Sequence, residues 1–319
     1  MKKALKIFGG LILFILLLMI LVPYLYKDKL IELVKTEANK NLNATLDFGD
    51  VDLTFFAHFP NLTLKIEDLT LTGTDEFEGI QLINVHSFNL VIGLGKVLKG
   101  NEIPDINKVY IEDPIVTTIV LKNGRVNWDI VKKEVDNGNE NTGGTDTSKP
   151  TDINVNLRYY EIKNAQINYT DNLSDMVLVI DGLNHSGSGN FGLDGLSLST
   201  KTHIENIMFQ MDKTRYIDNF SIDAALNFGV GLDLMRFTIT KGDIFLNKFE
   251  LQTTGYFEMP GDDIKMDIKF NSPSTGLKQL MALAPEEYTG DLDEYKFTGK
   301  VSFNGWLKGV YNDIQIPLF

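Results

Sequence analysis

The sequence contains no cysteine and only four histidines among its 319 residues. A chain without cysteine has no disulfide framework and no thiolate ligands for a metal. The histidines His58, His86, His185 and His203 are scattered, and no two of them have the i, i+4 spacing of a helical zinc site. The sequence therefore predicts neither a bound metal nor any other cofactor.

Positive charge is also scarce. The chain contains 30 Lys and Arg residues and 43 Asp and Glu residues, which gives a formal net charge of −13. Nucleic-acid binding needs a basic surface that neutralises phosphates. This composition excludes nucleic acid as an expected partner.

The common catalytic motifs are missing as well. Gly93 to Lys96 resembles part of a phosphate-binding loop, but Leu90 stands where its first glycine belongs and Val97 where Ser or Thr belongs. The acidic pairs Asp262-Asp263 and Glu286-Glu287 are adjacent in predicted turns, so they cannot face each other across a substrate. We therefore expect that the protein is not an enzyme.

The first 26 residues have the pattern of a membrane anchor. Every residue from Ile7 to Val22 is apolar or glycine, and a short interfacial extension brings this run to the length of a membrane span. A cleaved signal peptide is the alternative, but no small-residue cleavage pattern follows. The lysines Lys2, Lys3 and Lys6 favour a cytoplasmic N-terminus, which places the rest of the chain across the membrane.

Residues 27–133 are predicted to form a short amphipathic helix followed by a first β segment. Lys27 to Asn43 has one apolar stripe, and this helix either caps the first sheet or lies on the bilayer, with capping favoured. The period then changes to two, as in Leu62 to Ile66, and a turn is expected at Asn123-Gly124. Trp128 is expected to be a buried aromatic side chain that closes the segment.

A polar stretch separates this segment from a second one. Residues 134–152 are rich in Gly, Asn, Thr and Asp and are predicted to be a flexible linker. Their acidic spacing does not fit a calcium-binding loop. The chain ends abruptly at Phe319, so we expect it to be the N-terminal part of a longer protein.

The second segment, 153–319, is more strongly β. Alternation runs from Ile222 to Leu234 and again from Ile264 to Phe270. We predict turns at Lys241 to Asp243 and at Pro260 to Asp263, and one helix from Thr275 to Ala284 that ends before Pro285.

Alternation of this kind requires that every apolar sheet face be covered. Two sheets packed as a sandwich satisfy the requirement, and so does one curved sheet around an apolar guest such as acyl chains. A sandwich and a curved sheet around a guest both require apolar residues at every second position of a strand, so the sequence pattern does not distinguish them. From the residues alone, the sandwich is favoured.

Seven motifs, in order along the chain, carry a resemblance to a known family. They are Asn61 to Leu71, Val85 to Leu90, Leu94 to Gly100, Ile111 to Val116, Lys122 to Asp129, Lys278 to Pro285 and Gly299 to Gly305. Among them, Lys122 to Asp129 (KNGRVNWD) is similar to a "dGr-NWd" signature. Together they resemble the AsmA family of bacterial envelope proteins.

The resemblance implies a fold and a function. The fold is mainly β, with one N-terminal transmembrane helix, a short amphipathic helix and a curved, taco-like antiparallel β-groove of the chorein-like, bridge-type lipid-transfer class. The protein would be a single-pass inner-membrane protein with a periplasmic body that transports phospholipid between membranes and supports outer-membrane assembly and homeostasis. Its partners would be phospholipid or another acyl lipid, the inner membrane and other envelope proteins. The alternative is a non-transporting scaffold that modulates the targeting and assembly of outer-membrane proteins.

The resemblance also gives the alternating residues a role. Those predicted to face lipid are Ile222, Leu226, Phe228, Ile264, Met266, Ile268 and Phe270. Those predicted to face water are Asp223, Asn227, Lys265, Asp267 and Lys269.

Overall fold

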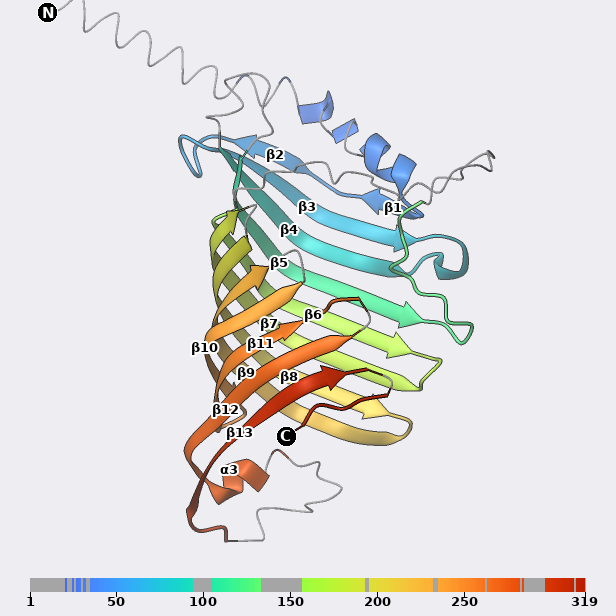
Figure 1. Cartoon of the computed structure of the whole chain (residues 1–319). Coiled ribbons are helices and arrows are strands. Elements are labelled where there is room, and N and C mark those ends of the chain that lie inside the picture. The colour runs from blue at the N-terminus through green and yellow to red at the C-terminus, as the bar shows by residue number, and fades with distance from the viewer. Residues whose placement is uncertain are drawn as a thin grey trace, which may run out of the picture. The chain divides into compact units, whose positions relative to one another are not determined.

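The structure is a computed structural model (Figure 1). It describes residues 35–93, 105–132, 157–192, 195–231, 235–261, 263–281, 283, 296–312 and 314–318, together with 21, 25, 27–29, 31 and 32. The predicted linker at 134–152 lies outside these residues, as does the predicted anchor from Ile7 to Val22 except for Leu21. Among the residues described, no helix combines the length and the apolar character that a membrane crossing needs.

The chain divides into two compact units. Unit 1 is drawn from Met1–Val109 and Asn127–Val155, and unit 2 from Tyr110–Val126 and Asn156–Phe319. Both are built mainly from antiparallel β-strands, as the alternation predicts.

Unit 1 is organised around one long strand, β3 (Leu62–Gly73). It pairs along one side with β1 (Ala44–Asp47) and β2 (Val51–Thr54), and along the other with β4 (Gln81–Gly93). A single 3-10 turn, η1 (Asp75–Phe77), connects β3 to β4. Two small cores form in this unit, one around Ala44, Leu71 and Leu82 and the other around Phe48, Val51 and Ile66.

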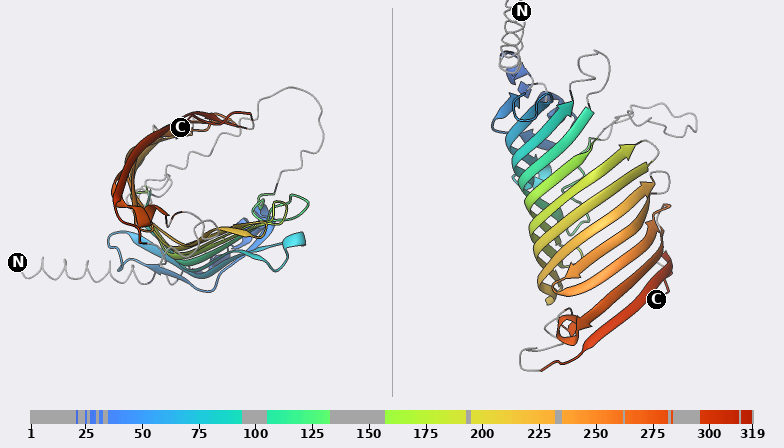
Figure 2. Two further views of the ribbon diagram at one scale, coloured as in Figure 1. Left: turned by 90° about the horizontal axis from the view of Figure 1, so that it is seen from below. Right: turned by 90° about the vertical axis from the view of Figure 1, so that its left-hand side faces the viewer.

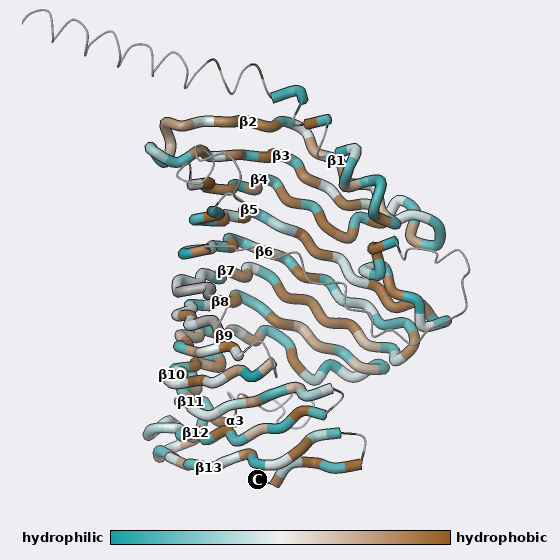
Figure 3. The backbone as a smooth tube through the Cα atoms, turned by 45° about the horizontal axis from the view of Figure 1, so that its top comes forward, coloured by the Kyte–Doolittle hydropathy of each residue, from teal (hydrophilic) through white to brown (hydrophobic). Residues whose placement is uncertain are grey.

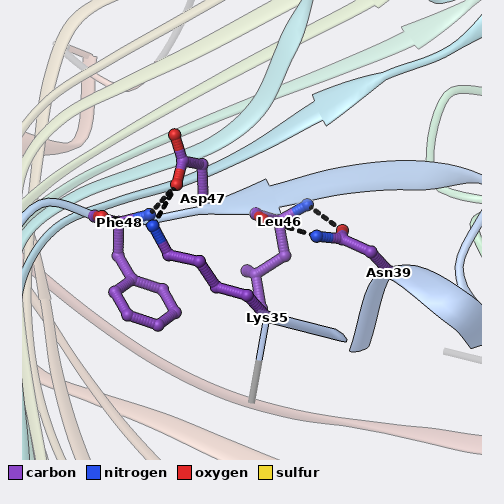
Figure 4. A network of polar contacts seen from close by, with 5 residues as sticks. All are labelled: Lys35, Asn39, Leu46, Asp47 and Phe48. Atoms are coloured by element: carbon purple, nitrogen blue, oxygen red, sulfur yellow. Dashed lines mark hydrogen bonds and ion pairs between the residues drawn. The ribbon is translucent and has the colours of Figure 1, made fainter. Parts of the chain in front are cut away.

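The residues expected to form a helix are helical at 27–29, 31, 32 and 35–41. Ile31 packs against the core around Phe48. Asn39 Nδ2 donates to the carbonyl of Leu46 (3.0 Å), and Asn39 Oδ1 accepts from the Leu46 amide (2.6 Å), as Figure 4 shows. Lys35 bonds to Asp47 and lies 4.5 Å from the centre of the Phe48 ring. The helix therefore caps β1, and its Asn39 satisfies backbone groups that an edge strand would leave exposed.

Unit 2 is one sheet in which each strand pairs with its neighbours in sequence, from β5 to β13. The strands are β5 (Asp105–Val120, which begins in unit 1), β6 (Tyr159–Asp171), β7 (Met176–Gly192), β8 (Gly195–Met211), β9 (Thr214–Gly231), β10 (Arg236–Leu246), β11 (Phe249–Glu258), β12 (Ile264–Gly276) and β13 (Lys300–Tyr311). Seen from below in the left panel of Figure 2, β6 to β13 follow an open arc. The sandwich favoured from the residues alone is wrong, because the described strands of unit 2 form a single curved sheet that does not close on itself.

Two local predictions are confirmed. The Asn123-Gly124 turn is present, with φ of 80° at Gly124 and a bond of 2.8 Å from the Leu121 amide to the Arg125 carbonyl. The turn after Pro260 also forms, with φ of 76° at Gly261.

Three predictions are wrong in detail. Lys241 to Asp243 is not a turn but an irregularity inside β10, where the register shifts between Ile239 and Gly242. The second helix is shorter than expected: α3 spans Leu277–Met281, because Thr275 and Gly276 still pair with β13. Trp128 is 42% exposed, and the neighbouring Asn127 is buried instead.

Candidate functional site

The register of unit 2 brings apolar side chains from five strands onto one side of the sheet. Directly paired residues point to the same side, and the pairs Ile222↔Leu246 and Leu246↔Phe249 connect β9, β10 and β11. Phe257↔Met266 and Ile268↔Leu307 extend the same side to β12 and β13. We call this the apolar face. It consists of Ile222, Leu226, Phe228 and Val230 on β9, Phe237, Ile239, Ile244 and Leu246 on β10, Phe249, Leu251 and Phe257 on β11, Ile264, Met266, Ile268 and Phe270 on β12, and Phe303, Leu307 and Tyr311 on β13. The alternation of hydrophobic and hydrophilic residues along these strands is visible in Figure 3.

All seven residues predicted to face lipid lie on the apolar face. Three come from β9 and four from β12, and each is only partly buried. Their sequence neighbours Asp223, Asn227, Lys265, Asp267 and Lys269 point to the opposite side of the sheet.

Sequence reasoning missed the residues that connect these two groups. Ile239 and Ile244 of β10 lie between β9 and β12 in the strand order. Their parity differs, because the bulge in β10 inserts a residue between them. A strict period of two therefore places one of them on the wrong side. Cross-strand register was the missing signal.

Ring contacts indicate that the apolar face is the inner side of the curve. Phe249 on β11 and Phe303 on β13 are separated by β12, a spacing of about 9.5 Å between flat strands. Their ring centres are nevertheless only 5.7 Å apart, in a stacked arrangement. Ser272, which pairs with Phe303, has no exposed surface. Side chains from the two flanking strands therefore converge over the middle one.

Glycines on the apolar face are covered by larger neighbours. A Cβ at Gly242 would lie 2.6 Å from the Thr253 methyl and 2.9 Å from Leu226 Cδ2, which approach from the two flanking strands. A Cβ at Gly305 would lie 2.5 Å from the Phe270 ring. Gly255 has a φ of 132°, and a Cβ there would overlap the Asp267 carbonyl. These positions let the sheet bend while its inner surface stays apolar.

A polar chain of three side chains interrupts the inner side at β6 to β8. Tyr160 Oη lies 2.9 Å from His185 Nε2, and His185 Nδ1 lies 2.8 Å from Thr202 Oγ1. Register places Tyr160 opposite Gly187, and His185 opposite Thr202, whose other neighbour is Ala224 of β9. The chain is therefore continuous with the apolar face and supplies neutral hydrogen-bonding groups beside it.

Burial keeps the hydrogen-bonded side chains of Tyr160 and His185 uncharged. It lowers the pKa of His185 below its ordinary value of 6.5 and raises the pKa of Tyr160 above 10. A nucleophile–base pair needs a basic imidazole and a third group that stabilises its charged form. Here the base is weakened and the third group is a neutral phenol. The geometry favours binding over acid–base chemistry.

The remaining histidines are separate from this chain and from one another. His58 Nδ1 contacts Thr63 Oγ1 (3.0 Å), His86 contacts Asp68 (3.3 Å) and His203 contacts Asp223 (2.7 Å). Within the described ranges, no cluster of three or more His, Asp or Glu side chains could hold a metal.

Comparison with known protein families decides the relationship that the motifs suggest. The AsmA family matches residues 1–225, which is well over half of the chain. The protein belongs to the AsmA family. The match runs through unit 1 and β5 to β8 and into β9 of this AsmA protein, so Ile222 lies inside it and the other six predicted residues follow it. No curated protein matches the chain. Family membership indicates an envelope-associated role.

Proposed function

We propose that this AsmA protein is anchored in the inner membrane by its N-terminal segment and binds the acyl chains of phospholipids along the apolar face. It would thereby move phospholipid between membranes and support outer-membrane assembly and homeostasis. The observation that carries the proposal is an inner sheet face that is apolar over five strands and on which most side chains, all but Val230 and Phe249, keep exposed surface.

The partial burial argues for an apolar guest. In a packed core such side chains would be closed off from water, yet the seven predicted residues all keep exposed surface. Leaving apolar area in water costs roughly 25 cal/mol per Å². Each acyl methylene that moves onto the face contributes about 0.8 kcal/mol by the same effect. Acyl chains would therefore stabilise the face in proportion to their length.

The absence of charge on the face fits the hydrocarbon part of a lipid. Between β9 and β13, the described residues on the inner side include no Asp, Glu, Lys or Arg. Burying an unpaired charge there would be costly, so a phosphate headgroup would stay outside. This arrangement is suited to many phospholipids that share acyl chains and differ in their headgroups.

The anchor and the topology rest on the sequence. The apolar run from Ile7 to Val22 and the preceding lysines favour a cytoplasmic N-terminus and a periplasmic body. Such an anchor would hold one end of the protein at the bilayer from which lipid is taken.

Co-purified lipid tests the proposal. The full chain, extracted from membranes and purified, is expected to carry phospholipid that mass spectrometry detects in an organic extract. Met266→Arg should remain folded and lose most of this lipid, because it places a charge on the apolar face. Asn227→Arg adds the same charge to the opposite side and should retain it.

Two results would contradict the proposal. One is a wild-type protein that is free of lipid. The other is a Met266→Arg protein that unfolds, since this would show that Met266 lies in a closed core.

A scaffold that modulates outer-membrane protein targeting through contacts alone is the second proposal. Phe56 and Phe59, in the loop between β2 and β3 of unit 1, are 57% and 69% exposed and offer an apolar contact surface. A scaffold would keep its effect in Met266→Arg and lose it in Phe56→Ser/Phe59→Ser, as measured by the amount of assembled outer-membrane protein.

A further inference from the structure

The outer side of β11, β12 and β13 carries a regular array of polar side chains with one tryptophan at its corner. Thr254, Lys269 and Trp306 lie directly opposite one another in one row across the three strands. Gln252, Asn271 and Asn304 form the next row, two residues further along each strand. We call these six residues the polar grid. It lies on the side of the sheet opposite to the apolar face.

Trp306 offers an open aromatic surface in this grid. It is 45% exposed although it lies on the polar side of the sheet. Among the described residues, no second ring and no cation lies over it, and its indole N–H has no acceptor. A tryptophan in this state presents both a flat apolar ring and a hydrogen-bond donor to whatever binds there.

The grid is also hollowed and rich in available hydrogen-bonding groups. An open depression of about 860 Å³ is lined by all six grid residues and by Lys241 and Asp243 of β10. The row that runs between the two rows of the grid also lines it, and this row consists of Gly242, Thr253, Phe270 and Gly305. Asn271 donates to Gln252 (3.4 Å) and Gln252 to Glu250 (3.2 Å), which orients these two amides. The side chains of Thr254, Lys269 and Asn304 make no hydrogen bond within the described part of the chain. The depression thus combines donors, acceptors and one ring.

The spacing of the grid matches a sugar ring. Adjacent strands are about 4.8 Å apart and residues i and i+2 about 6.7 Å apart, so the grid measures roughly 10 by 7 Å. A pyranose ring with its hydroxyl groups has similar dimensions to one cell of this array. Its C–H groups pack on an indole ring while its hydroxyls donate to and accept from amides, hydroxyls and ammonium groups.

We infer that the polar grid is a saccharide-binding site for a flat, β-1,4-linked glycan, with one pyranose unit stacked on Trp306. Flatness matters because the depression is open and its floor is the sheet surface itself. The other ligand classes fit less well. An acyl chain would contact only one large apolar side chain in the grid, that of Trp306. A nucleic acid would be repelled by a protein with a net charge of −13. The inference does not depend on lipid binding at the apolar face.

Intrinsic fluorescence provides a direct test, since the chain has two tryptophans. Trp128→Phe makes Trp306 the sole tryptophan of the full-length protein in detergent. Titration with chitotriose, a β-1,4-linked trimer of N-acetylglucosamine, is expected to change the Trp306 emission saturably. Maltotriose, which is α-1,4-linked and curved, is expected to bind about tenfold more weakly.

Saturation-transfer NMR with chitotriose then tests the residues. Trp306→Ala should weaken binding about tenfold or more. Asn304→Ala removes a smaller side chain, is less liable to disturb the fold, and should weaken binding by a smaller factor. Phe245→Ala removes another exposed aromatic from the same side of the sheet and should leave binding unchanged. An unsaturable emission change, equal binding of maltotriose, or full binding by Trp306→Ala would overturn the inference.

Discussion

At the scale of single residues, the protonation of His185 reports how far the inner side of unit 2 is shielded from water. Burial lowers the pKa of its imidazole below 6.5. As the pH falls, the unfolded chain therefore takes up a proton at this residue before the folded chain does. The stability that neutral His185 contributes is present above about pH 6.5 and is lost as the pH falls toward its folded-state pKa.

Replacing His185 should remove this dependence. We expect that the free energy of unfolding of wild type falls more steeply between pH 7.5 and 5.5 than that of His185→Gln, measured by urea denaturation at several pH values. The three other histidines are common to both proteins and cancel in the difference. Parallel pH profiles would show that the imidazole is as well hydrated in the folded as in the unfolded chain.

Gly255 tests how closely the strands of unit 2 approach one another. Gly255→Ala places a Cβ against the Asp267 carbonyl at a φ of 132° and should destabilise the protein by about 1–3 kcal/mol. Gly261→Ala is the matched control, because Gly261 also has a positive φ but open space around it. The control should lose less stability, as measured by thermal or urea unfolding. Equal losses would mean that backbone strain alone, and not the contact, requires glycine.

At the scale of elements, the helix on β1 shows how unit 1 protects a sheet edge. Asn39 makes two hydrogen bonds to the backbone of Leu46, and Lys132 closes the helix end by donating to the carbonyls of Asn39 (3.3 Å) and Lys40 (3.0 Å). Lys132 lies more than ninety residues away in sequence. The cap therefore joins distant parts of unit 1.

Asn39→Ala should open this edge. The loss of two net hydrogen bonds costs about 1–3 kcal/mol, and the amide of Leu46 should exchange faster in hydrogen–deuterium exchange. Asn41→Ala is the control and should leave that amide protected, because among the described residues the Asn41 side chain bonds within the helix, to the carbonyl of Glu37. Unchanged exchange at Leu46 in Asn39→Ala would indicate that water or another group replaces the side chain without cost.

The elements also show what the sequence could and could not predict. Alternation correctly predicted which residues of β9 and β12 point to the same side of the sheet, because neither strand has a bulge among the predicted residues. The turn predicted at Lys241 to Asp243 was wrong, because a glycine between two charged residues has the composition of a turn. In the structure Gly242 lies in the strand, because Thr253 and Leu226 fill the space that a side chain would occupy.

The candidate sites differ in how visible they are in the sequence. The seven predicted residues of the apolar face occupy two local patterns, and each pattern is visible by itself. The Tyr160–His185–Thr202 chain and the polar grid each combine residues from three strands. Only the register brings such residues together, and register depends on turns and bulges that period-two patterns do not specify.

At the scale of the whole molecule, the choice between a sandwich and a single curved sheet is not encoded in any one segment. Both architectures need the same apolar parity. The difference lies in what covers the apolar face, and within unit 2 the described residues leave it partly exposed. An AsmA protein that binds acyl chains would complete this face with its ligand.

Photo-crosslinking in living cells tests this central claim most directly. The chain would carry the photoreactive residue p-benzoylphenylalanine either at Met266, on the apolar face, or at the adjacent Lys265, on the opposite side. After irradiation and purification of the full chain, mass spectrometry would measure covalently attached phospholipid. We expect phospholipid adducts at position 266 and few or none at position 265. Equal adducts at both positions, or none at either, would contradict it.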